Sequence, residues 1–119
     1  VQVYYAFDEA LNELMEEGVA KRIARYKKVA TLIRERMAKL GVKPLLTPDK
    51  QSNTITAYHL PEGVTYQSLH DQLKKEGYVI YAGQGQLESK IFRVANMGAL
   101  TEAQLVGFLD AFERICGTA

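Results

Sequence analysis

An arginine inside an apolar segment is the first residue of this sequence that could do chemistry. In the run Ile-Phe-Arg-Val at residues 91–94, strand alternation places Phe92 and Val94 on one face and Arg93 on the other. A planar guanidinium on a rigid strand suits bidentate binding of a carboxylate or a phosphonate. A surface arginine paired with a neighbouring acid is the alternative, and it is the more common situation because most arginines are exposed.

The loop that precedes this segment is the second candidate. Its two glycines, Gly83 and Gly85, allow the backbone to approach a ligand closely or to adopt a positive φ. The loop lacks the third glycine and following helix of a dinucleotide fingerprint, and the lysine of a phosphate-binding P-loop. An ordinary connection between two strands is the alternative. The candidate loop contacts are Tyr81, Gly83, Gln84 and Gly85.

The remaining reactive side chains lack partners at a useful spacing. His59 and His70 have no further histidine or cysteine at metal-ligand spacing, so we expect neither to bind a metal. No lysine has the strand-loop setting of a Schiff-base residue, and no nucleophile has an obvious base. The single cysteine, Cys116, fits a reducing, cytoplasmic setting. The sequence therefore predicts no catalytic centre, metal site or bound cofactor in this chain alone.

The charge balance argues against nucleic acid and membranes as partners. Fifteen lysines and arginines stand against 14 aspartates and glutamates, and no apolar run is long enough to span a bilayer. Residues 19–40 are nevertheless rich in lysine and arginine, and a nucleic-acid-binding stripe there is the less favoured alternative to a solvated face. Glu9, Glu13, Glu16 and Glu17 precede this segment and can neutralise part of it.

Hydrophobic spacing predicts the elements that position these residues. Apolar residues three and four apart predict helices at residues 4–15, 19–40, 65–76 and 101–115, and alternation or short apolar runs predict strands at 42–46, 53–60, 78–81 and 90–95. Thr101 followed by Gln104 matches a capping box at the start of the last helix. We therefore expect a single α+β domain over residues 1–119, with a small, mostly antiparallel sheet of about four strands and the helices on one face.

Three segments resemble class V, fold-type I aminotransferases, which depend on pyridoxal phosphate. Residues 16–26 are similar to the EEGxxxRxxRY stretch at which the small domain of these enzymes begins. Residues 77–83 and 92–98 are similar to a pair of segments written GF-V-I-Y-P-G and F-R-I-G-N-I-G. The chain departs from this pattern at Ala82, where many members have proline, and at Gln84, where many have lysine. It also has Val94-Ala95 in place of isoleucine and glycine.

The resemblance covers nearly the whole chain and implies a function. It implies the C-terminal small domain of a larger aminotransferase, similar to the members that use 2-aminoethylphosphonate and pyruvate and, more distantly, to those that use alanine and glyoxylate. Arg93 matches the arginine that binds the carboxylate of the amino or keto acid. The cofactor lysine belongs to the large domain, so the isolated chain is expected to be inactive. A free-standing small-molecule-binding or regulatory module is the alternative.

The resemblance also implies partners for the first predicted helix. In the family this helix packs partly against the large domain, and here Tyr4, Tyr5 and Phe7 lie on its apolar face. An uncovered face of this kind favours self-association. We therefore expect the large domain, an amino or keto acid and a second copy of the chain as partners.

Overall fold

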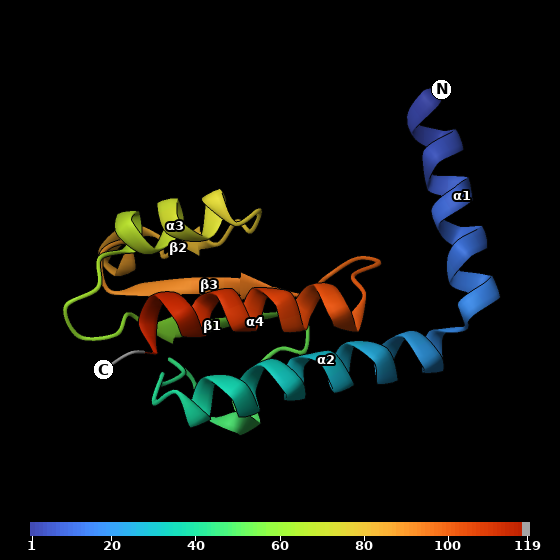
Figure 1. Cartoon of the computed structure of the whole chain (residues 1–119). Helices are drawn as coiled ribbons and strands as arrows, with labels where there is room; N and C mark the ends of the chain where they lie inside the picture. The colour runs from blue at the N-terminus through green and yellow to red at the C-terminus, as the bar shows by residue number, and fades with distance from the viewer. Residues whose placement is uncertain (118–119) are drawn as a thin grey trace.

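A three-stranded antiparallel sheet lies at the centre of the domain (Figure 1). The computed structural model describes residues 1–117. Strand β3 (Ile91–Ala95) is central, with β1 (Ile55–His59) on one side and the two-residue β2 (Tyr81–Ala82) on the other. The predicted α+β fold is confirmed.

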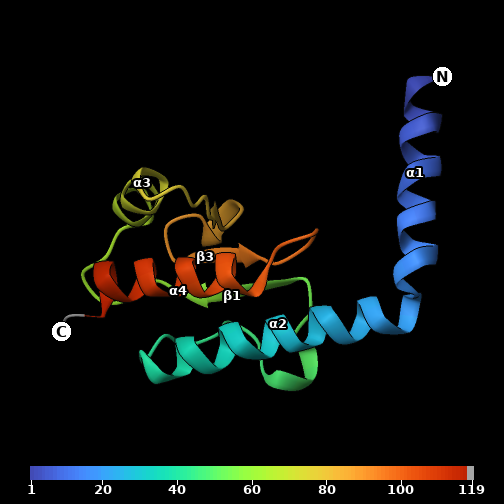
Figure 2. The ribbon, with the colours of Figure 1, turned by 45° about the vertical axis from the view of Figure 1, so that its right-hand side comes forward.

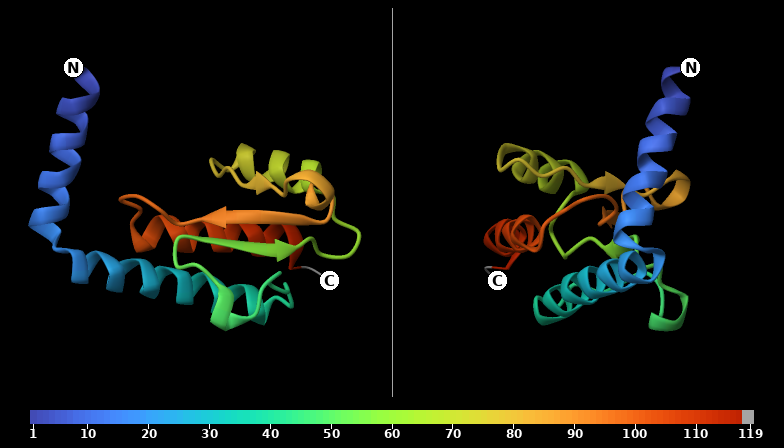
Figure 3. Two further views of the ribbon diagram at one scale, coloured as in Figure 1. Left: turned by 180° about the vertical axis from the view of Figure 1, so that it is seen from behind. Right: turned by 90° about the vertical axis from the view of Figure 1, so that its right-hand side faces the viewer.

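Three helices cover one face of this sheet: α2 (Val19–Lys39), α3 (Tyr66–Lys75) and α4 (Glu102–Cys116) (Figure 3). Helix α4 packs against both α2 and α3. The core forms where these helices meet Tyr58, Phe92 and Val94 of the strands. The ring of Phe92 stacks between Tyr58 and Phe112, with ring centroids 5.6 Å apart in both pairs. Burial of this alternate set of strand residues leaves the other set, including Arg93, on the face without helices.

Helix α1 (Gln2–Glu17) projects away from the rest of the domain (Figures 1 and 2). Gly18 separates it from α2 with a φ of 85°, a conformation that glycine adopts without steric cost. None of the residues of α1 is buried. The helix is therefore an arm whose direction is set at its C-terminal end.

The prediction of about four strands was wrong by one. Residues 42–46 contribute only an isolated bridge between Pro44 and Tyr58. Two hydrogen bonds form it, from the Leu45 amide to the carbonyl oxygen of Ala57 and from the His59 amide to that of Lys43, both at 2.9 Å. The strand expected at 78–81 begins only at Tyr81. The amide of Tyr78 donates instead to the carbonyl oxygen of Leu73 at the end of α3, at 2.9 Å, which holds the start of this segment away from β3.

The helix boundaries follow local signals in the sequence. The capping box is present, with Thr101 Oγ1 accepting from the Gln104 amide at 3.2 Å and Gln104 Oε1 accepting from the Thr101 amide at 2.9 Å. Within the described residues, no helix has the length and apolar character needed to cross a membrane.

Candidate anion-binding site

Arg93 lies in the middle of β3 on the face of the sheet that the helices leave open. Its cross-strand neighbours are Ala57 on β1 and Tyr81 on β2, so all three side chains share this face. The Nε–H of Arg93 donates to the carbonyl oxygen of Ala82 at 2.8 Å. This bond fixes one edge of the half-buried guanidinium and leaves the two terminal nitrogens to bind another group.

Arg93 differs from most other arginines of the domain in having no carboxylate partner among residues 1–117. Arg22 and Arg25 pair with Glu17, Arg36 pairs with two acids of α4, and Arg114 pairs with Glu76. The surface ion pair that was the alternative for Arg93 is not formed in the described part of the chain. Its charge is therefore available to an external anion.

A hollow of about 220 Å³ lies beside Arg93. A second cation, Lys50, lines it from the short 3₁₀ turn Pro48–Lys50, which comes shortly before β1. No carboxylate is part of the lining, so the hollow carries a positive charge that suits an anion. Besides Arg93 and Lys50, the lining residues are Leu46, Gln51, Ser52, Ile55, Thr56 and Ala57.

None of the four predicted loop residues lines this hollow. Tyr81 lies beside Arg93 across the strands, with about half of its surface exposed. Gly83, Gln84 and Gly85 are not among the residues that line the hollow. A Cβ on Gly83 would lie 2.4 Å from the carbonyl oxygen of Leu87, so the glycine is required for the packing of its own loop. Gly85, with a φ of 57°, begins the 3₁₀ helix Gly85–Leu87.

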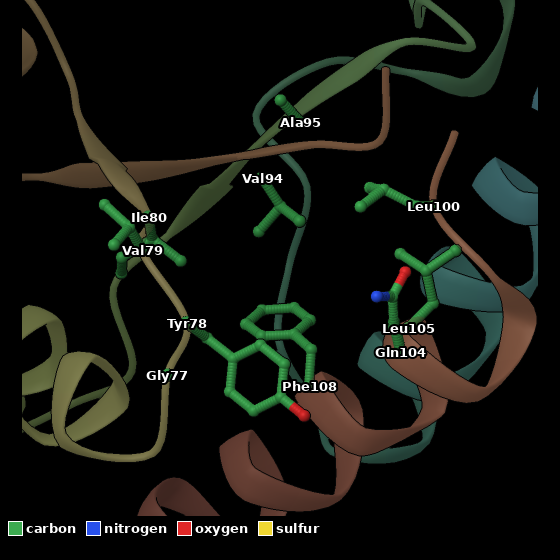
Figure 4. A pocket seen from close by; sticks show the side chains of 10 residues that line it. All are labelled: Gly77, Tyr78, Val79, Ile80, Val94, Ala95, Leu100, Gln104, Leu105 and Phe108. Atoms are coloured by element: carbon green, nitrogen blue, oxygen red, sulfur yellow. The ribbon is translucent and has the colours of Figure 1, made fainter. Parts of the chain in front are cut away.

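A larger hollow of about 290 Å³ lies on the helix-covered side of the sheet (Figure 4). Tyr78 and Phe108 form one wall of it with their rings, and Val94 and Leu105 point into it. No charged residue lines it, so it is unsuited to an anionic substrate.

The histidines and the cysteine have ordinary surroundings. His59 is exposed. The ring of His70 packs at a tilt against that of Tyr66, and its Nδ1 lies 3.1 Å from Oδ1 of Asp71. Burial raises the pKa of the Cys116 thiol, which makes it a weaker nucleophile at neutral pH. Within residues 1–117, no three histidines, cysteines or acids are grouped as a metal site would require.

Four of the eight basic side chains of α2 form ion pairs in the described residues, and most of the acids that pair with them are not the ones expected. Of the four glutamates in α1, Glu17 forms ion pairs with this helix. The others come from α4: Glu102 pairs with Lys28, and Asp110 and Glu113 pair with Arg36. Salt bridges to a neighbouring helix leave less charge for a nucleic acid.

Several known enzymes are similar to this chain in sequence. No protein-family model matches the chain. The chain is 40% identical over 109 residues to a 2-aminoethylphosphonate–pyruvate transaminase of Bacillus cytotoxicus, and 38% identical over 116 residues to one of Bacillus thuringiensis. These alignments cover 88% and 94% of this chain but only 29% and 31% of those relatives.

Solved structures agree with this result. The alanine–glyoxylate aminotransferase of Nostoc sp. superposes with a TM-score of 0.88 at 27% identity, over 94% of this chain and 30% of that one. The chain matches one domain of the aminotransferases. The resemblance of this chain to aminotransferases is thereby confirmed.

Aminotransferases of this family depend on pyridoxal phosphate, but the described residues do not form a site for it. The hollow beside Arg93 contains Lys50 yet no carboxylate that could face the pyridine nitrogen. Lys50 is exposed in a surface turn, where nothing excludes water from its amine. The lining of this hollow therefore has the charge to suit an anion but not the groups that would hold the cofactor.

Sequence reasoning found Arg93 but missed Lys50. The turn sequence Thr-Pro-Asp-Lys at residues 47–50 was visible, but its proximity to Arg93 depends on the pairing of β1 with β3. That pairing is a long-range property that the local pattern does not determine.

Proposed function

We propose that this chain is the small domain of a larger pyridoxal-phosphate-dependent aminotransferase and that Arg93 binds the anionic group of its substrate. The observation that carries the proposal is the half-buried guanidinium, oriented by the carbonyl oxygen of Ala82 and lacking a carboxylate partner in the described residues. The names of the Bacillus relatives support 2-aminoethylphosphonate and pyruvate as the amino donor and acceptor. The large domain of the same protein is the proposed partner that holds the cofactor.

The contribution of this chain to the reaction is binding and orientation. A carboxylate held by both terminal nitrogens of Arg93 has a fixed plane, because the guanidinium fork matches the two carboxylate oxygens. Fixing one end of a small amino or keto acid restricts the position of its α-carbon relative to groups outside this chain. Lys50 adds a second positive charge at the same hollow, which favours a phosphonate dianion.

The proposal is tested by titrating the chain with pyruvate and with methylphosphonate while following the ¹⁵N–¹H signals of Arg93 Nε and of the amides of Ala57 and Tyr81. Weak but saturable shifts are expected, because this chain supplies only part of the proposed site, and Arg93→Met should weaken binding about tenfold, the size of effect typical of a hydrogen-bonded charge. Arg114→Met is the matched control, since Arg114 pairs with Glu76 far from β3 along the chain. Equal affinities in all three proteins would contradict the proposal.

The larger enzyme provides a second arm of the same test. Arg93→Ala should severely impair use of the keto acid while leaving the cofactor absorbance unchanged, because no cofactor contact is assigned to Arg93. An unaltered dependence on pyruvate would overturn the assignment. Tight carboxylate binding by the isolated chain would instead favour a free-standing binding module.

A further inference from the structure

A cluster of ion pairs surrounds the junction between α1 and α2. Glu17, the last residue of α1, accepts hydrogen bonds from Arg22 Nε at 2.6 Å and from Arg25 Nε at 2.6 Å. Arg25 Nη2 adds a third bond to the same carboxylate at 3.2 Å. Both oxygens of Glu17 are therefore bound across the break at Gly18, and a side chain of this kind cannot rotate without losing several charged hydrogen bonds.

The same arginine also holds the loop that follows the Arg93 strand. Arg25 Nη1 donates to the carbonyl oxygen of Gly98 at 2.9 Å, and the amide of Gly98 donates to Tyr26 Oη at 3.2 Å. The guanidinium of Arg25 lies 4.9 Å from the centroid of the Tyr26 ring. Gly98 adopts a φ of 96°, which presents both of its peptide groups to α2.

The loop after β3 is tied in turn to the wall of the anion-binding hollow. The amide of Asn96 donates to the carbonyl oxygen of Thr54 at 2.9 Å, and its side-chain nitrogen donates to that of Asn53 at 2.9 Å. Asn96 is buried, so these bonds are protected from water. Asn53 follows Ser52, which lines the hollow. Hydrogen bonds therefore join Glu17 to Arg25 and Arg25 to Gly98, and others join Asn96 to the segment 53–54 beside the hollow, with the 96–98 backbone connecting the two sets.

We infer that Glu17, Arg22, Arg25, Tyr26 and Gly98, here named the Glu17 clamp, position α1 relative to the strand that carries Arg93. Helix α1 buries none of its own residues, so the clamp supplies the main constraint on its direction. A group that packs on α1 and a ligand that binds Arg93 are then held in a fixed orientation relative to each other. Each member of the clamp is a positioning residue. The inference concerns geometry within this chain, and only its consequence for anion binding rests on the proposed function.

The clamp has a characteristic dependence on pH. Hydrogen bonds from Arg25 and Arg22 lower the pKa of Glu17 from 4.5 to about 2. Because the folded pKa is depressed, the stabilisation is present above the ordinary glutamate pKa and is lost as the pH falls through about 2. Arg22 and Arg25 of α2 are the charged groups that face Glu17, and the neighbouring Tyr26 and the 96–98 loop add no acid to the cluster.

The test measures the direction of α1 by electron–electron double resonance in the full chain. Spin labels are placed at Asp8→Cys on α1 and Lys75→Cys on α3, both exposed positions, in a Cys116→Ser background. The unaltered clamp should give one narrow distance distribution, and Glu17→Gln should broaden it about twofold as α1 reorients on the microsecond scale. Glu16→Gln, which removes the adjacent exposed charge, is the matched control and should leave the width unchanged.

Two further measurements keep the inference falsifiable. Tyr26→Phe removes only the hydroxyl that accepts from Gly98 and should broaden the distribution less than Glu17→Gln does. The narrow distribution should also persist near pH 3.5, roughly one unit below the ordinary glutamate pKa. A broad distribution in the parent chain, or equal widths for Glu17→Gln and Glu16→Gln, would overturn the clamp. A failure of anion binding by the parent chain would sink the proposed function and leave this result intact.

Discussion

Arg93 is oriented by a backbone carbonyl rather than by an acid, and this is the decisive feature at the scale of single residues. A carboxylate partner would orient the guanidinium equally well but would cancel the charge that the ligand needs. The carbonyl of Ala82 accepts one hydrogen bond and leaves the net charge in place. Orientation and charge are thus provided separately, as an anion site requires.

Lys50 is expected to distinguish substrates by charge. Lys50→Met should weaken methylphosphonate binding by about threefold to tenfold and pyruvate binding by less, since a dianion gains more than a monoanion from a second cation. The comparison is made by the titration described for Arg93. Lys90→Met, which removes a lysine outside the hollow, is the control. An unchanged affinity for both ligands would place Lys50 outside the site, and an equal loss for both would contradict the expected preference for the dianion.

The sequence was sufficient for some residues of the site and insufficient for others. The exposure of Arg93 opposite Phe92 and Val94 follows from the two-residue period of a strand, which is local information. The joining of Glu17 to Gly98, and of Lys50 to Arg93, depends on how distant elements pack. The motif that contains Glu17 and Arg25 is visible in the sequence. The bond from Arg25 to Gly98 could be identified only once α2 and the 96–98 loop were placed.

At the scale of elements, the loop from Gly83 to Lys90 is built for packing. Gly83→Ala should lower the free energy of unfolding by about 1–3 kcal/mol, because the new Cβ would overlap the carbonyl of Leu87 and the side chain of Ile91. Chemical denaturation measures this loss, with the exposed Gln84→Ala as the control. Anion affinity at Arg93 should change little. A variant of unchanged stability with lost anion binding would instead support a ligand role for Gly83.

The strands were less predictable than the helices for a physical reason. Helices α2 and α4 bury stripes with a regular spacing, and local caps mark their ends, so their positions follow from nearby residues. Residues 42–46 and 78–80 have strand-like composition, but their partners decide whether they join the sheet. Residues 42–46 pair with β1 only at the Pro44–Tyr58 bridge, and the amide of Tyr78 bonds to Leu73 at the end of α3 instead of to β3.

At the scale of the whole molecule, α1 leaves a large apolar surface uncovered. Val3, Tyr4, Tyr5, Phe7 and Met15 are all more than 60% exposed. We expect the isolated chain to form dimers or larger species, and Tyr4→Ser with Phe7→Ser should shift it towards monomer because less apolar surface is then buried. Sedimentation equilibrium across a range of concentrations measures both. A strictly monomeric parent chain at high concentration would contradict this expectation.

The placement of all three packed helices on one side of the sheet has a consequence for how such a domain can evolve. Neighbouring residues of β3 lie in different surroundings: Phe92 and Val94 pack in the core, whereas Arg93 between them faces the hollow. On β1, Ala57 and Tyr58 are divided in the same way. Changes at the positions that face the hollow can therefore accumulate without disturbing the core, and the chemistry of the open face can change while the folding of the domain is preserved.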